Sequence, residues 1–346
     1  MKSLCSNNFC NKGVVKYVTR LAYLWFCFLA VSTAQALPFP MLDARTAAMG
    51  GASISHGIRN SAFYNPALAA LEPEGYDWYI LLPGEGEFKS DADSLSNIGD
   101  DVYQEYKYDV IQITIPTPFL GGSAYIAEYD FHTAKVLNGA DLSHRAISVF
   151  ETGVSVAQLQ DVLWAENVLM GATIKLMILE SYGYQEPLAS AGFDLDSDEL
   201  ERDSVLTLDF GMSKEYGVWK TAFVAKNLYS RDHKYGKSNE KYKIEPQLRA
   251  GVAYQSRRSV VEFDLDLLKN EGVGYASDTM FASLGWEWSV FRAFDLRFGF
   301  QQNFAGDKNS TFSAGFGLQM WSLLLDFSAS VDPDGSGSYL QASWEF

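Results

Sequence analysis

The feature that most constrains the fold is a strict alternation of apolar and polar residues along short segments, clearest in the second half of the chain. Leu206 and Leu208, for example, flank Thr207. A period of two residues is that of a β-strand whose two faces differ in chemistry. From residue 76 onward no long segment has helical periodicity, and no apolar run is long enough for a membrane-spanning helix. The sequence therefore predicts an all-β fold.

About fourteen strands can be drawn on this pattern, and the connections between them alternate between long and short. Short turns at one end and longer loops at the other are typical of outer-membrane barrels with an even strand number. The expected strands are 76–83, 109–116, 121–130, 145–157, 167–179, 204–213, 218–227, 247–255, 259–267, 280–289, 293–303, 311–320, 322–330 and 338–346. The connections expected to be long are 84–108, 131–144, 180–203, 228–246, 268–279, 304–310 and 331–337.

Alternation alone does not say which face of the strands lies inside. A soluble sandwich also alternates, but it turns its polar face outward, whereas a membrane barrel turns its apolar face toward lipid. The aromatic content of 14%, the signs of export described next and strands of about nine or ten residues favour the membrane form. We therefore expect residues 76–346 to form a transmembrane antiparallel β-barrel in contact with outer-membrane lipid.

Residues 1–36 have the pattern of a secretory signal peptide. A basic region ends at Arg20, an apolar core follows, and an Ala-Gln-Ala sequence ending at Ala36 fits the cleavage site, so the mature chain is expected to begin at Leu37. A membrane anchor is the alternative, but the apolar core is short for one. All three cysteines lie in this segment, which excludes disulfides and thiolate metal sites from the exported protein. The expected location is the outer membrane.

Residues 37–75 are expected to form a plug inside the barrel. The stretch Asp43–Leu71 is rich in small residues and is too broken by Gly and Pro for one long helix. Glycine lets backbone lie close to the wall, and proline after a turn-forming asparagine fixes the chain. The alternative is a packed stopper without a ligand. The residues expected to line the plug or a ligand are Gly50, Gly51, Asn65, Pro66 and Ala67.

The polar faces of the later strands carry charges that would point into the lumen of such a barrel. Most charges inside a barrel are structural, but they can also reject anions in an open pore. An open pore of this kind would be a diffusion channel. The residues expected to face the lumen are Arg249, Glu262, Asp264, Asp266 and Arg297.

The chain ends on an amphipathic strand in which Leu340, Ala342, Trp344 and Phe346 share one face. A last strand with a terminal Phe resembles the signal by which the barrel-assembly machinery recognises outer-membrane barrels. Trp344 and Phe346 are therefore expected to act as an insertion signal. The alternative is an ordinary closing edge strand.

Composition and motifs argue against nucleic-acid binding, catalysis and metal binding. The formal net charge is −16, and an acidic protein is a poor partner for phosphate backbones. The four histidines show no paired metal spacing, and there is no HExxH or GxSxG motif. Asp194, Asp196 and Asp198 alternate as in a calcium loop but lack its glycine and final glutamate, which favours a solvated acidic loop. No enzyme activity, cofactor or metal is expected.

The stretch Asp43–Ala52, DARTAAMGGA, followed by Phe63–Ala67, FYNPA, resembles the start of the FadL-type long-chain fatty-acid transporter superfamily of outer-membrane proteins. More closely, it is similar to the barrel group known as conjugal transfer TraF proteins. The resemblance implies a fourteen-stranded barrel with an N-terminal plug that moves hydrophobic small molecules across the outer membrane. The alternatives are a plugged or open diffusion porin and a non-transporting assembly, secretion or conjugation component.

Overall fold

The computed structural model describes residues 39–56, 61–70, 79–82, 84–90, 102–115, 121–138, 141–162, 165–187, 200–229, 231–236 and 241–345. The expected signal peptide, the three alternating aspartates Asp194, Asp196 and Asp198, and Phe346 lie outside this set.

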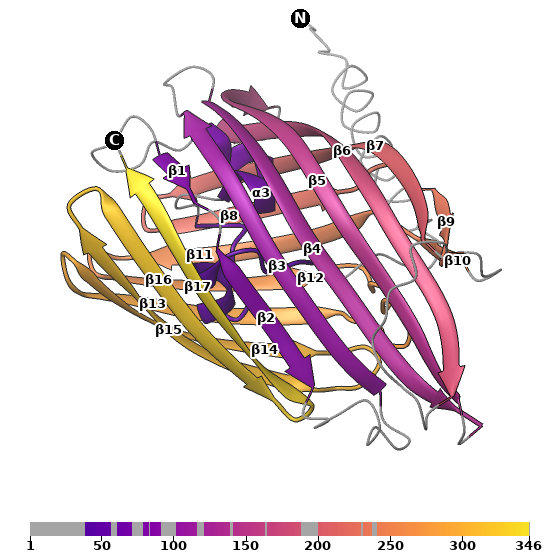
Figure 1. Cartoon of the computed structure of the whole chain (residues 1–346). Helices are drawn as coiled ribbons and strands as arrows, with labels where there is room; N and C mark the ends of the chain where they lie inside the picture. Colours follow the sequence, from indigo (N-terminus) through magenta and orange to yellow (C-terminus); the bar gives the residue numbers. More distant parts are fainter. Residues whose placement is uncertain are drawn as a thin grey trace, which may run out of the picture. The chain divides into compact units, whose positions relative to one another are not determined.

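The described strands form one closed antiparallel barrel, drawn in Figure 1. They follow one another round the wall in sequence order, and the last strand pairs with the first two. Strands β1 (Tyr79–Leu81) and β2 (Glu85–Ser90) share one place between β3 and β17, so the barrel has fourteen strand positions. The other wall strands are β3 (Val102–Ile115), β4 (Gly121–Leu137), β5 (Asp141–Val162), β6 (Ala165–Pro187), β7 (Glu201–Tyr216), β8 (Trp219–Lys226), β11 (Gln247–Gln255), β12 (Ser259–Asp266), β13 (Phe281–Phe291), β14 (Phe294–Asn303), β15 (Ser310–Met320), β16 (Leu323–Asp332) and β17 (Gly335–Glu345).

The short strands β9 (Asp232–Lys234) and β10 (Lys241–Lys243) pair only with each other, in the connection between β8 and β11. Three short helical elements precede the barrel: α2 (Ala44–Ala48), α3 (Ser61–Tyr64) and the 3-10 helix η1 (Pro66–Ala70). Among the described residues, no helix has the length and apolar character needed to cross a membrane.

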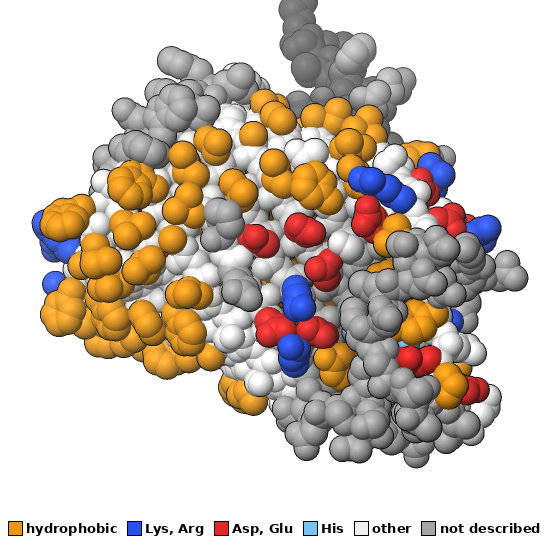
Figure 2. All heavy atoms as spheres, in the orientation of Figure 1, with side chains coloured by type: hydrophobic (Ala, Val, Ile, Leu, Met, Phe, Trp, Pro, Cys, Tyr) orange, Lys and Arg blue, Asp and Glu red, His pale blue; other side chains and the backbone are white. Residues whose placement is uncertain are grey.

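The two faces of the wall are arranged as lipid contact requires. On β7, Leu206 and Leu208 are 59% and 50% exposed, whereas Thr207 and Asp209 between and beside them are each 1% exposed. Apolar residues therefore face outward and polar residues inward, the reverse of a soluble sandwich. Figure 2 shows hydrophobic side chains over the upper and left parts of one face, with charged side chains gathered at its centre and right. The predicted fold class, an all-β antiparallel barrel of fourteen strands, is confirmed.

Each expected strand overlaps a wall strand, but several boundaries are wrong. The stretch 131–144 was expected to be a long connection, yet β4 runs to Leu137 and β5 begins at Asp141. The expected connection 84–108 contains β2 and the start of β3, and most of the expected connection 331–337 belongs to β16 and β17. These boundaries are wrong because several strands are longer than a bilayer crossing requires. Strands β5 and β6 have 22 and 23 residues, about twice the 9–11 that cross a bilayer, so their outer parts need no apolar face.

The N-terminal segment, defined here as residues 39–56 and 61–70, packs against the inward face of the wall. Helix α2 contacts β14 to β17, and η1 contacts β4 to β7. In Figure 1 these indigo and violet elements are seen through the ring of strands. The apolar side chains of the segment join one buried cluster with wall residues of β4 to β8. Burying each such side chain contributes about 1.5–3 kcal/mol. These side chains from the segment are Phe39, Leu42, Ile54, Phe63 and Tyr64.

Candidate ligand-binding site

The two parts of the N-terminal segment are joined through Asp43, which begins α2. One carboxylate oxygen, Oδ1, accepts the backbone N–H of Thr46 over 2.9 Å, as an N-cap residue does. The other, Oδ2, accepts the hydroxyl of Tyr64 over 2.5 Å, and that hydroxyl accepts the N–H of Leu42 over 2.8 Å. The aspartate thus holds α2 beside α3 although 21 positions separate the two side chains.

Gly50 and Gly51 end α2 in a conformation that other residues rarely adopt. Their φ angles are +65° and +84°, and the N–H of Gly51 donates to the carbonyl of Thr46 over 2.9 Å. A Cβ on Gly50 would lie 2.7 Å from the backbone nitrogen of Phe300 on β14. Both glycines therefore lie against the wall. The backbone there has the conformation of a turn, and it also lies close to a strand.

Asn65 fixes the turn between α3 and η1. Its side-chain Nδ2 donates to the carbonyl of Ile54 over 2.9 Å and to that of Met212 on β7 over 3.3 Å. Its Oδ1 accepts the N–H of Ala67 over 3.1 Å. Asn65 and Ala67 are 0% exposed, and Pro66 between them is buried. A fully buried amide with three partners is costly to lose.

The turn packs against glycines of the wall. A Cβ on Gly211 of β7 would lie 1.9 Å from Oδ1 of Asn65, and one on Gly171 of β6 would lie 2.4 Å from the carbonyl carbon of Pro66. Real Cβ atoms do not approach so closely, so larger residues would displace the turn. The close packing of the turn therefore depends on wall residues that have no side chain, as well as on the N-terminal segment.

Two of the charges expected in the lumen bind backbone of the N-terminal segment. Asp264 Oδ2 accepts the N–H groups of Ser53 and Ile54 over 2.8 and 3.1 Å. Glu262 Oε1 accepts those of Ser55 and His56 over 2.6 and 3.1 Å. Both carboxylates are buried, 1% and 0% exposed. They satisfy N–H groups that would otherwise be buried without partners.

The other three expected lumen charges are paired. Arg249 Nε donates to Asp266 over 2.6 Å, and its Nη1 donates to the carbonyl of Gly51 over 3.2 Å. Arg297 Nε donates to Glu287 over 2.7 Å. All are at most 6% exposed. The structure therefore brings the charges of β11 to β14 against the N-terminal segment, instead of leaving them in a hydrated space.

His56 is buried among charges without a partner for its ring nitrogens in the described part of the chain. The pKa of His56 is lowered to about 3, mainly by burial and also by the positive charges of Arg45 and Lys220, against a smaller opposite effect of Glu287. The imidazole is therefore neutral at ordinary pH.

Sequence reasoning missed a second buried charge group on β5 to β8. Lys175 lies 3.1 Å from Glu151 and 3.0 Å from Asp209. Lys226 donates to the carbonyl of Phe63 over 2.9 Å, and its Nζ lies 3.7 Å from the centre of that ring. The available signal was local: Lys175 is the polar residue between Ile174 and Leu176 in an alternating stretch.

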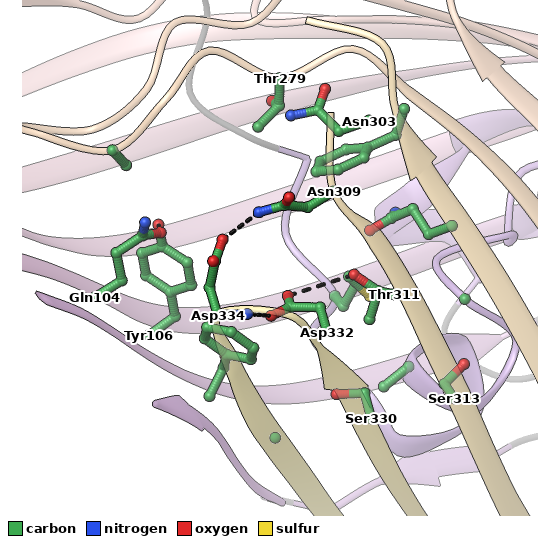
Figure 3. A pocket seen from close by; sticks show the side chains of 18 of the residues that line it. Gln104, Tyr106, Thr279, Asn303, Asn309, Thr311, Ser313, Ser330, Asp332 and Asp334 are labelled. Carbon is green, nitrogen blue, oxygen red and sulfur yellow. Dashed lines mark hydrogen bonds between the residues drawn. The ribbon is translucent and has the colours of Figure 1, made fainter. Parts of the chain in front are cut away.

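Sequence reasoning also missed a cavity above the N-terminal segment. The space among its lining residues, counting open solvent, is about 1230 Å³. The segment lines it with Phe39, Met41, Ala47 and Gly50. The rest of the lining comes from strands β2, β3 and β13 to β17 and from the connections that follow β12, β14 and β16. Figure 3 shows Gln104 and Tyr106 on one side of the cavity and Asp332, Asp334 and their neighbours on another. These residues come from strand ends far apart in the sequence, so no motif marks them.

Of the two residues expected to form the insertion signal, only Trp344 is described. It is 44% exposed on the outer face of β17, opposite Ile80 and Leu323. The described residues contain no group of three or more His, Cys, Asp or Glu side chains arranged to hold a metal ion.

Comparison of the structure with solved structures finds outer-membrane channels of the same fold. The CymD monoaromatic hydrocarbon channel is 12% identical with a TM-score of 0.63, over 90% of this chain and 99% of that one. The toluene transporter TodX of Pseudomonas putida is 12% identical with a TM-score of 0.55, over 89% and 98%. A TodX deltaS2S3 mutant channel is 13% identical with a TM-score of 0.58, over 88% and 99%. At such identities the likeness concerns the fold.

The sequence itself matches one family model, described as "F plasmid transfer operon, TraF, protein", over residues 120–266. No curated protein matches the chain. The matched range runs from the start of β4 to the end of β12, whereas the resemblance seen in the sequence was sharpest over residues 43–71. The two signals therefore rest on different parts of the chain and agree. The chain has the FadL-type fold of outer-membrane barrels and, between residues 120 and 266, matches the TraF family.

Proposed function

We propose that the protein is an outer-membrane channel for small hydrophobic compounds and that residues 37–75 are its plug. The observation that carries the proposal is the cavity over the N-terminal segment, with Phe39 and Met41 on the segment side and aromatic residues on the wall. The solved channels of the same fold, named for monoaromatic hydrocarbons and toluene, support this class of compound. Their names describe transport, which supports a role without catalysis.

The plug proposal rests on the contacts of the N-terminal segment. Its backbone is held by Asp264 and Glu262, its turn by Asn65, and its helix by Glu287. An open diffusion porin would leave such inward-facing groups to water. The TraF match favours one other role, as a component of a transfer apparatus, which the uptake test below separates from transport.

The location follows from the same proposal. Residues 1–36 would be removed as a signal peptide, the apolar outer face would contact outer-membrane lipid, and the barrel-assembly machinery would insert the chain. An amphipathic wall of this kind is stable only in a bilayer or a detergent that replaces it.

Uptake of a hydrophobic fluorescent probe by cells that express the protein tests the function. Asn65→Ala removes two buried hydrogen bonds and one partly buried one, each costing about 1–3 kcal/mol when a partner is left unsatisfied, and should misplace the segment beside the cavity. We expect uptake to fall by about fivefold or more while the barrel still assembles. Gln158→Ala, an exposed change on β5, is the control. Equal uptake by wild type and cells without the protein would refute transport.

A further inference from the structure

Two neighbouring turns at one end of the barrel carry three exposed arginines. The turn between β11 and β12 holds Arg257 and Arg258, and the turn between β13 and β14 holds Arg292. The two turns lie side by side, because the N–H of Ser289 donates to the carbonyl of Arg258 over 2.9 Å. Neither turn contains an acidic residue. We call Arg257, Arg258 and Arg292 the basic patch.

The basic patch has no partner in the protein. Within the residues that the structure describes, none of its three guanidinium groups has an ion-pair or hydrogen-bond partner. Glu215, near the end of β7, lies 2.8 Å from Lys220 instead. Asp295, near the start of β14, lies 3.6 Å from Arg297. The whole chain carries a formal net charge of −16, so unpaired cations in two adjacent turns are a local exception.

Exposed aromatic side chains border the basic patch on the outer face of the wall. Trp286 and Trp288 of β13 stack with ring centres 6.4 Å apart, and both are exposed. Trp288 pairs in register with Ser259, the first residue of β12 after the patch. Phe291, at the end of β13, is 71% exposed. Aromatic residues in such positions are typical of the boundary between the hydrocarbon and the head groups of a bilayer, so the basic patch lies at the level of the head groups.

We propose that the basic patch and the tryptophans beside it bind an anionic phospholipid, one whose head group carries a phosphodiester and no cation. Short turns such as these lie at the periplasmic end of an outer-membrane barrel, so the lipid would come from the leaflet on that side. Guanidinium groups bind phosphate oxygens through two parallel hydrogen bonds, and basic clusters beside a bilayer attract anionic lipid. The acyl chains would lie against Trp286 and Trp288. The inference requires insertion in a membrane but not transport.

A zwitterionic lipid with the same acyl chains is the natural comparison. Its phosphate is the same, but its ammonium group would meet the three arginines as a like charge. Native mass spectrometry of the full protein in detergent, with dioleoyl-phosphatidylglycerol and dioleoyl-phosphatidylcholine as probes, measures the preference directly. We expect the wild type to bind the anionic lipid at least about tenfold more tightly. Equal binding of the two lipids would overturn the proposal.

Neutralising the basic patch should remove the preference. In the triple variant Arg257→Gln, Arg258→Gln and Arg292→Gln we expect the preference to fall by about tenfold or more, since each arginine near an anionic lipid contributes about fivefold. All three side chains are exposed in turns, so the barrel should assemble as the wild type does. An unchanged preference in this variant would contradict the proposal.

The matched control removes three exposed cations at the other end of the barrel. Arg202→Gln, Arg231→Gln and Lys241→Gln change the net charge equally, but each of these cations already lies within 4 Å of an acid. We expect this control to keep the preference of the wild type. A loss as large as that of the patch variant would show that net charge sets the preference, and the site would be refuted.

Two further measurements separate the head group from the chains and from free phosphate. Trp286→Leu with Trp288→Leu should weaken binding of both lipids alike and leave their ratio unchanged, because these residues face the chains. A changed ratio with unchanged total binding would contradict that assignment. Millimolar inorganic phosphate should not displace the lipid, and complete displacement would show that the arginines bind free phosphate instead of a lipid surface.

Discussion

Arg45 of α2 donates its Nε to Glu287 of β13 over 2.9 Å, across 242 positions of sequence. Glu287 also accepts Nε of Arg297, and Arg297 donates in turn to Asp326 on β16. Asp295 lies 3.6 Å from Arg297 as well, so two cations and three carboxylates are linked, and one of the five belongs to the N-terminal segment. Removing one member of a buried pair leaves an uncompensated charge, which costs about 3–5 kcal/mol.

The Arg45→Met variant should therefore loosen the N-terminal segment without opening the wall. We expect faster hydrogen exchange over residues 44–56, measured by mass spectrometry, because Glu287 and Asp326 are then left with one cation. Adding Glu287→Gln removes the carboxylate that Arg45 would otherwise pair with. The loss of protection from hydrogen exchange in the double variant should therefore be smaller than the sum of the losses in the two single variants. Strictly additive effects would show that the pair does not hold the segment.

Two adjacent glycines of β4 give a matched test of close packing. A Cβ on Gly121 would lie 2.2 Å from the carbonyl oxygen of Ala69, whereas a Cβ on Gly122 would have no neighbour nearer than 3.9 Å. We expect Gly121→Ala to displace η1 and increase its exchange, with Gly122→Ala close to wild type. Thermal unfolding of both variants shows whether the barrel wall keeps its stability. The same behaviour in both would mean that η1 does not depend on this approach.

Protonation of His56 should weaken docking of the segment. Its pKa is about 3 when docked, mainly because burial disfavours the charged form, and its ordinary value is 6.5. Between these values the undocked form binds more protons, so docking weakens as the pH falls from 6.5 toward 3, by at most about 1.4 kcal/mol per pH unit. The charged groups that act on the ring are Arg45, Lys220 and Glu287. His56→Gln should lose that part of the pH dependence of exchange, and identical pH profiles would exclude His56 as its source.

The wall was predictable because membrane contact imposes a pattern on every strand that crosses. The alternation of Leu206 and Leu208 with Thr207 already contained the inside-out arrangement, although the sequence alone did not say which face was outside. The alternating pattern did not identify the parts of strands on which membrane contact imposes no constraint. The end of β5 at residues 141–144 and the end of β6 at residues 180–187 fall in expected connections, because strand ends that extend past a bilayer need no apolar face.

The cavity was not predictable for a different reason. Tyr106, Asp332 and Tyr339 lie on separate strands and Asn309 lies in the connection before β15, and only barrel closure brings the four together. The expected plug residues, by contrast, form a local motif that neighbouring residues explain. Gly50 adopts a positive φ, and the side chain of Asn65 accepts a hydrogen bond from the N–H of Ala67, two residues further along the chain. Their partners in the wall, such as Gly171 and Gly211, are single glycines in strands and carry no signal of their own.

Assembly offers a prediction at the C-terminus. Removing Phe346 should reduce the amount of heat-modifiable protein, seen as the shift in gel migration between unboiled and boiled samples, because Phe346 and Trp344 are the residues expected to form the insertion signal. Phe346→Tyr keeps an aromatic ring and should assemble as the wild type does. Full assembly after the deletion would rule out the terminal residue as an insertion signal.

Ion conductance decides whether the N-terminal segment closes the barrel. A fourteen-stranded barrel is wider than the eight-stranded ones that side chains alone can fill, so an unplugged form should conduct. In planar bilayers we expect small currents from the intact protein and much larger ones after deletion of Gly50–Ala67. The deletion removes the N–H groups that now occupy Glu262 and Asp264, and the freed carboxylates should make the open pore prefer cations, measured as a shift in reversal potential.

Replacing Gly50–Ala67 by a glycine-serine chain of equal length separates specific contacts from bulk. The replacement cannot supply the Asn65 bonds or the close fit against Gly171 and Gly211, so it should conduct nearly as well as the deletion. If it instead blocks current as the native segment does, the lumen is closed by chain volume and the contacts serve stability alone. A large ungated current from the intact protein would show that the segment is no plug, and the protein would then be a diffusion channel whose buried charges set its ion preference.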